Sequence, residues 1–206
     1  MKERQDAPSV IAPAVKRPSR AEAEAAVETL IRWAGDDPER EGLRDTPRRV
    51  VKAYLDIFSG NFREASEELD ATFPAEAGYG EIVLVSDIRF HSHCEHHITP
   101  FFGMAHVGYI PSDRIVGLSR IARLVQTCAR RLQTQERLTA EVAEILQETL
   151  AAEGVAVLME AEHLCMSMRG VRQPGTQTLT AHFTGIFKDD AVKQSQFISL
   201  VRKGTP

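Results

Sequence analysis

The sequence predicts an α+β fold, in which an antiparallel sheet in the order ββααββ carries two helices on one face and a helical extension at its N-terminus. Two observations indicate this order. Runs rich in β-branched and aromatic residues form two pairs, and a long segment with helical apolar spacing separates the pairs. Two further amphipathic segments precede the first pair. Strands joined by short connections pair antiparallel, so the helices between the two pairs are expected to cover one face.

The chain is expected to divide into three parts. Residues 1–18 carry three prolines among alanines and charged residues, without an apolar period, which predicts a disordered tail. Residues 19–80 are predicted to form a helical region. Residues 81–206 are predicted to form the domain that contains the sheet.

Two helices are predicted in the N-terminal region. Ser19 opens a capping box, and Gly35 is expected to end the helix that follows. Thr46 is expected to cap the second helix, which has Pro47 in its first turn. Apolar residues of the second helix share one face and are expected to be buried: Val50, Val51, Tyr54, Leu55 and Phe58.

The sheet and its helices are predicted from alternating patterns along the rest of the chain. The turn Gln173-Pro174-Gly175 separates the last two strands. The elements are expected as strands over 81–90 and 103–110, helices over 118–132 and 138–149, and strands over 155–169 and 176–187.

Composition limits the class of protein. The formal net charge of -4 argues against a nucleic-acid coat or a membrane-surface protein. No apolar stretch approaches the ~20 residues of a membrane span, and the N-terminus lacks the apolar core of a signal peptide. Three cysteines, two of them beside histidines, fit a reducing compartment and metal binding better than a disulfide framework. We therefore expect a cytoplasmic protein.

A metal-binding motif lies in the bend expected between the first two strands. Cys94 and His97 have C-x-x-H spacing, and a thiolate and an imidazole three residues apart can bind one zinc ion. Two ligands do not complete a site. A nearby histidine could close the site as a structural one, and the candidates for that fourth ligand are His91, His93 and His96.

The third ligand is expected downstream, in His163-Leu164-Cys165. If this segment continues as a strand, side chains alternate, so His163, Cys165 and Arg169 share one face. Three protein ligands leave the fourth position of zinc open to water, which is typical of a catalytic site.

A basic face opens the helix predicted over 118–132. Ser119 and Arg123 are four residues apart, with Arg120 beside them. A helix N-terminus with added arginines can bind phosphate groups. The alternative is a solvated basic surface.

Gln135 and Glu136 begin the next helix. Glu136 could stabilise the helix dipole. In a pocket, its carboxylate could instead accept two hydrogen bonds from the adjacent N–H and NH2 donors of guanine, which adenine does not offer as a pair.

Several separated segments, in this order, resemble the GTP cyclohydrolase I family. The segments are 42–50, 94–97, 109–111, 117–121, 135–139, 163–165 and 169–171. The resemblance implies the T-fold, in which sheets assemble into toroids, and a homodecamer of two pentamers with active sites where subunits meet. It implies conversion of GTP and water into formate and 7,8-dihydroneopterin triphosphate, the first step of folate or tetrahydrobiopterin-type pterin biosynthesis. Allosteric regulation is compatible with it, and nucleic acid and membrane are not expected partners.

The resemblance also implies roles for individual residues. The metal is expected to be zinc, held by Cys94, His97 and Cys165. The acid/base residues are His96 and His163, and the guanine contacts are Gln135 and Glu136. The triphosphate contacts are Arg120, Arg123 and Arg169, with Ser119 beside the ribose. Ser119, Gln135 and Glu136 also count among the catalytic residues.

Two positions depart from the family pattern. Residues 131–134 stand where many relatives carry a proline before the Gln-Glu pair, and Arg120 stands where relatives often have lysine. His91 and His93 are also unusual beside the C-E-H-H core, and a hydrogen-bonding role for His93 is preferred to a metal role.

Two other readings compete. A T-fold nitrile reductase would use a cysteine nucleophile and a nicotinamide cofactor, whereas both candidate cysteines here stand beside histidines. A non-catalytic protein with a structural zinc would not need His96, His163 and Glu136.

Overall fold

The computed structural model describes residues 16–76 and 79–204. The disordered tail was predicted for residues 1–18, of which residues 1–15 lie outside this part of the chain. Packing divides the chain into two compact units, one ending at Leu55 and the other beginning at Asp56. The region between Asp56 and residue 80, which was predicted to belong with the N-terminal helices, is part of the second unit.

The N-terminal unit contains α1 (Arg20–Trp33) and most of α2 (Thr46–Ile57). The predicted capping box is present, because the Ser19 hydroxyl accepts the Glu22 N–H and the Glu22 carboxylate accepts the Ser19 N–H. The predicted buried face of the second helix is wrong for a single chain, since Leu55 is 49% exposed. Among the described residues up to Leu55, only two prolines are buried, so the N-terminal unit by itself does not cover this face.

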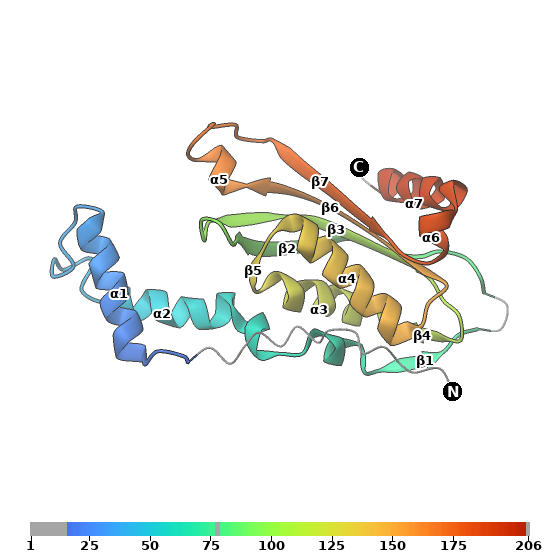
Figure 1. Cartoon of the computed structure of the whole chain (residues 1–206), viewed down its shortest axis with the longest axis horizontal. Helices are drawn as coiled ribbons and strands as arrows, with labels where there is room; N and C mark the ends of the chain where they lie inside the picture. Colours follow the sequence, from blue (N-terminus) through green and yellow to red (C-terminus); the bar gives the residue numbers. More distant parts are fainter. Residues whose placement is uncertain (1–15, 77–78, 205–206) are drawn as a thin grey trace. The chain divides into compact units, whose positions relative to one another are not determined.

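The second unit is built on a five-stranded sheet (Figure 1). Its order is β5-β2-β3-β6-β7, and all neighbouring pairs are antiparallel except β5, which runs parallel to β2. The strands are β2 (Val83–Cys94), β3 (Pro100–Ile110), β5 (Leu132–Gln133), β6 (Gly154–His163) and β7 (Gln177–Phe183). The predicted α+β class and the ββααββ order are confirmed.

Two amphipathic helices, α3 (Leu118–Ala129) and α4 (Gln135–Leu150), cover one face of the sheet (Figure 1). Their fully buried leucines, Leu124, Leu138 and Leu146, pack into one core with Val107 and Val157 of the central strands. The apolar spacing in the sequence therefore predicted this layer correctly.

The opposite face carries helices that were not predicted. A second core gathers Ile110 and Ala156 of the sheet with Phe187, Phe197 and Val201. The last three belong to α6 (Ile186–Asp189) and α7 (Ala191–Gly204). The remaining elements are η1 (Ser59–Phe62), η2 (Ala65–Leu69) and a separate two-stranded sheet of β1 (Thr72–Pro74) and β4 (Arg114–Val116).

Two predicted strands end earlier than expected. The strand predicted over 155–169 stops at His163 and continues as the short helix α5 (Leu164–Ser167). Phe101 pairs with His163, and β3 extends only one residue further, to Pro100, which has no N–H to donate to the ladder. The strand predicted over 176–187 stops at Phe183.

The first strand is longer than predicted. His91, Ser92 and His93 pair with β3, so only the residues after Cys94 form the bend. None of the described helices is long and apolar enough to cross a membrane.

Candidate active site

Three side chains from distant parts of the chain meet at one end of the sheet. Cys94 is the last residue of β2, His97 lies in the turn that follows, and Cys165 belongs to α5. Their ligand atoms all lie within 4.8 Å of one another, and Cys94 Sγ is 3.9 Å from His97 Nδ1. Ligands of a tetrahedral zinc lie roughly 3.3–3.8 Å apart, given bonds of ~2.0–2.3 Å. The three predicted ligands are therefore grouped closely enough to hold a metal ion, with the Cys94 and His97 atoms slightly further apart than around a bound zinc.

The electrostatics of the thiols also favour a cation. Burial raises the pKa of the Cys165 thiol, and the neighbouring Cys94 raises that pKa further. The Cys94 thiol therefore disfavours the thiolate form of Cys165 when no cation is bound. A bound dication would reverse this effect, because metal coordination deprotonates thiols.

No fourth histidine, cysteine or carboxylate joins this group within the part of the chain that the structure describes. The His93 ring packs edge-on against Phe58 at 5.3 Å, and His91 lies tilted against Phe102. Burial lowers the pKa of His93. His96 Nδ1 lies 3.7 Å from Cys94 Sγ, but His96 is outside the group that all three ligands share. Within the described residues, this group therefore offers a metal ion three protein ligands.

The imidazole ring of His163, two residues from Cys165, has one partner at its edge and another on its face. Its Nε2 lies 2.7 Å from Gln135 Oε1, and its ring stacks on buried Phe101 with planes 2° apart. Burial lowers the pKa of His163, while the charge of Glu136 opposes that shift.

Gln135 and Glu136 face opposite surroundings although they are adjacent. Gln135 is only 1% exposed, and its side chain bonds to the backbone of β6 and β7. Glu136 is exposed in the first turn of α4. Two adjacent polar residues at the start of a helix are normally expected to be exposed, so nothing in the local sequence predicts that Gln135 is buried.

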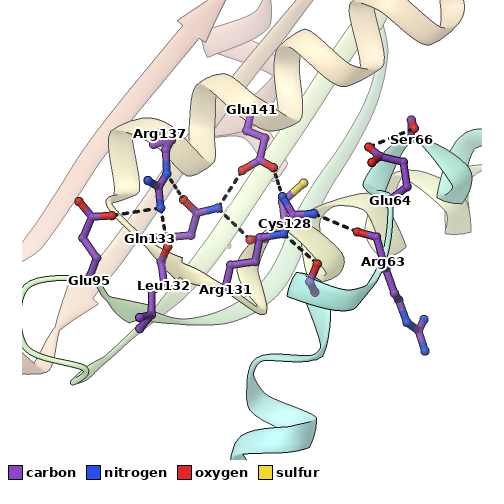
Figure 2. A network of polar contacts seen from close by, with 11 residues as sticks. Arg63, Glu64, Ser66, Glu95, Cys128, Arg131, Leu132, Gln133, Arg137 and Glu141 are labelled. Carbon is purple, nitrogen blue, oxygen red and sulfur yellow. Dashed lines mark hydrogen bonds and ion pairs between the residues drawn. The ribbon is translucent and has the colours of Figure 1, made fainter. Parts of the chain in front are cut away.

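A polar network that was not predicted holds the strand that ends in Cys94. The Glu95 N–H donates to the Gln133 carbonyl at 3.0 Å, and Cys94 pairs with Gln133 in the parallel ladder. The Gln133 side chain accepts from Arg137 and donates to Glu141 (Figure 2). Arg137 also forms an ion pair with Glu95 at 3.1 Å. Residues 131–134 therefore form a strap that is bonded to the metal loop, the loop after Cys94 that contains His97.

The same network continues away from the metal ligands. Arg131 pairs with Glu141 and donates to the backbone carbonyls of Gly60 and Arg63 (Figure 2). It connects the metal loop to the segment around η1.

The expected phosphate-binding residues are not gathered at the metal group within one chain. Ser119, Arg120 and Arg123 lie in the first two turns of α3, and the opposite end of this helix leads into β5 beside Cys94. A twelve-residue helix is ~18 Å long, so its length separates these residues from the metal group. Arg169 is exposed two residues after α5, the helix that contains Cys165.

The chain was compared with known proteins. Residues 23–202 match the family model described as GTP cyclohydrolase I. A protein named GTP cyclohydrolase 1 from Brucella canis is 55% identical over 187 residues, which are 91% of this chain and 88% of that protein. The protein of the same name from Sinorhizobium fredii is 55% identical over 186 residues, which are 90% of this chain and 91% of that protein.

A solved structure titled as the archaeosine synthase QueF-Like in the apo form aligns with a TM-score of 0.43 and 17% identity. The alignment covers 50% of this chain and 93% of that one. The family match begins within α1 and includes α2, residues 131–134 and all three residues of the candidate metal group. This chain therefore belongs to the GTP cyclohydrolase I family.

Proposed function

We propose that this protein is a zinc-dependent hydrolase that converts GTP and water into formate and 7,8-dihydroneopterin triphosphate, the first step of folate or tetrahydrobiopterin-type pterin biosynthesis. The observation that carries the proposal is the group of Cys94, His97 and Cys165, the last of which is two residues from His163, in a chain of this family. The names of its relatives support the substrate.

Zinc is the metal that suits this group. Two sulfurs and one imidazole nitrogen form a ligand set that zinc prefers, and three protein ligands leave one position open. When bound, zinc supplies Lewis-acid activation of water near neutral pH.

His163 and His96 are proposed to move protons. Opening the imidazole ring of guanine requires a proton at N7, because C8 accepts a nucleophile poorly otherwise. His163 is the proposed partner of N7, since its ring is fixed by Gln135 and Phe101. His96, exposed between Cys94 and His97, would serve opening of the ribose and the rearrangement before the pterin ring closes.

Substrate recognition is proposed to rest on charged and polar side chains around the metal. Glu136 is exposed beside His163 and can accept both guanine donors. The resemblance gives Gln135 the same role. The triphosphate contacts are proposed to be Arg120, Arg123 and Arg169, with Ser119 beside the ribose.

We further propose a homodecamer of two pentamers, in which a neighbouring subunit completes each site. The length of α3 separates Arg120 and Arg123 from the metal ligands within one chain, which supports a contribution from a second copy. Apolar side chains that one chain leaves exposed, such as Trp33 at 88%, also support association. The three free cysteines support a cytoplasmic location.

Incubation of the purified full chain with GTP tests the proposed function. We expect formate together with a pterin that fluoresces after oxidation, and we expect His163→Ala to abolish both. A nitrile reductase would consume a nicotinamide cofactor and leave GTP intact. A protein with a structural zinc would contain metal but release no formate, and either result would overturn the proposal.

A further inference from the structure

We propose that Gln135 is a positioning residue, which fixes the tautomer of His163, rather than a guanine contact. The inference rests on the proposed function, because it assigns His163 a proton-transfer role. It changes the role that the family resemblance implies for Gln135.

The Gln135 side chain is surrounded by acceptors at its amide nitrogen. Nε2 lies 3.1 Å from the Met159 carbonyl and 2.9 Å from the Thr178 carbonyl, which belong to β6 and β7. It also lies 3.1 Å from the hydroxyl oxygen of Thr180. A carbonyl oxygen cannot donate, so the two backbone partners can only be satisfied by the NH2 group of the amide. The opposite amide orientation would place oxygen against oxygen in a buried site.

The fixed amide determines which nitrogen of His163 carries hydrogen. Gln135 Oε1 can only accept, and it lies 2.7 Å from His163 Nε2. Nε2 must therefore be the protonated nitrogen in the neutral ring. Nδ1 is left as the nitrogen that can exchange a proton with the substrate.

The ring cannot escape this constraint by rotating. Phe101, fully buried, stacks on it at 4.5 Å between centroids. Phe101 and His163 are also directly opposite in the β3–β6 ladder, so backbone pairing sets their spacing. Contact on one face and a hydrogen bond at one edge together define the ring plane and its orientation.

Gln135 itself is held by a second buried layer. The Thr139 hydroxyl donates to the backbone carbonyl of Gln135 at 2.7 Å and lies 2.6 Å from the hydroxyl of Thr180, which is a partner of the Gln135 amide. Thr139 and Gln135 are each 1% exposed. The side chain of Gln135 would have to leave its partners in β6 and β7 to reach a base, whereas exposed Glu136 needs no such change.

The test compares Gln135→Leu with Gln147→Leu in the zinc-loaded full chain. Gln147 lies in the same helix, and its side chain also makes two hydrogen bonds, to Ala152 and Thr184. It is twelve residues from Gln135, which is ~18 Å along the helix. We expect Gln135→Leu to lower kcat by roughly 10-fold to 100-fold, with KM for GTP changed by less than about threefold. We expect Gln147→Leu to leave both constants near those of the unchanged protein.

A spectroscopic measurement on the unchanged protein does not depend on the variant folding. Solid-state ¹⁵N spectra of histidine-labelled, zinc-loaded protein, with His163→Gln used to assign the signal, should show His163 protonated at Nε2. Protonation at Nδ1 would overturn the inference. So would a Gln135→Leu protein that folds, keeps kcat and raises KM, because that pattern describes a guanine contact. If the unchanged protein releases no formate from GTP, the proposed function fails instead, and the spectrum still decides the tautomer.

Discussion

The imidazole of His163 lies parallel to the phenyl ring of Phe101, with ring centroids 4.5 Å apart and planes within 2°. The two residues are direct partners across β3 and β6, so this stacking is built by the sheet and not by a loop. His163 therefore contacts the buried core through Phe101 and lies in the candidate active site at the same time.

Phe101→Leu should therefore lower kcat more than its loss of stability explains. Leucine keeps most of the apolar volume, so we expect a loss of about 1–1.5 kcal/mol in the free energy of unfolding. Removal of the flat face should let the imidazole tilt, and kcat should fall about tenfold. Phe187→Leu in the second core is the control, with a similar loss of stability and unchanged kcat. Equal kcat in the two variants would show that the stacking has no role in catalysis.

Chelation should inactivate the enzyme reversibly. We expect about one zinc ion per chain in the active protein, loss of formate release after exhaustive chelation, and recovery when zinc is added. Cys165→Ser should bind zinc more weakly because a hydroxyl is a poorer ligand than a thiolate. Cys128→Ala should keep its zinc, since Cys128 lies outside the ligand group. Full activity in metal-free protein would show that zinc is not needed for formate release.

The metal ligands could be predicted from sequence because the C-x-x-H spacing is local and residue types restrict the ion. The convergence of Cys165 with Cys94 could be expected only because strand order brings their ends together. The helical turn at Cys165 could not be predicted, because it depends on where the neighbouring strand β3 begins, at Pro100. The amphipathic helices α3 and α4 were predictable from periodicity, which records one buried face.

Partners in space, rather than local pattern, decide the features that sequence reasoning missed. Gln133 and Gln135 look like solvent-facing residues at a helix start, yet each is 1% exposed. Their burial depends on acceptors in β6, β7 and α4. Similarly, α7 buries Phe197 and Val201 only because the second face of the sheet is there to receive them.

Cys128 should not react with thiol reagents in the folded protein. Its thiol is fully buried, and burial raises its pKa, with the charge of Glu141 adding to the shift. A raised thiol pKa means that the reactive thiolate is scarce at pH 8 and becomes common only at higher pH. In a Cys94→Ser/Cys165→Ser protein, we expect no labelling at pH 8 until denaturant is added. Rapid labelling under native conditions would contradict the burial of this thiol.

Glu141→Ala should destabilise the domain through the network in Figure 2. The variant leaves Arg131 without its partner in an ion pair whose side chains are 24% and 21% exposed, and it removes an acceptor of Gln133. We expect a loss of about 2–3 kcal/mol, less than for a fully buried pair because water reaches this one. Asp56→Ala removes the partner of Arg130 in an exposed pair and should cost about 0–1 kcal/mol. Urea denaturation of both variants measures the difference, and similar midpoints would mean that the network contributes little.

Gly185→Ala should be among the most damaging single changes in the chain. Gly185 has a φ of +50°, and a Cβ there would lie 2.1 Å from the Glu153 carbonyl oxygen, so backbone must move. This turn leads from β7 into α6, and the Ile186 N–H bonds to the same carbonyl at 2.9 Å. We expect a loss of more than about 3 kcal/mol in the free energy of unfolding.

Gly175→Ala is the matched control for that change. Gly175 also has a positive φ, +79°, but a Cβ there meets nothing within 4 Å. Its cost should be limited to the left-handed backbone conformation, about 1–2 kcal/mol. Thermal or urea unfolding of the two variants separates conformational strain from the steric clash. Equal losses would show that the close approach to Glu153 relaxes freely, and that α6 and α7 do not depend on this turn for their place on the sheet.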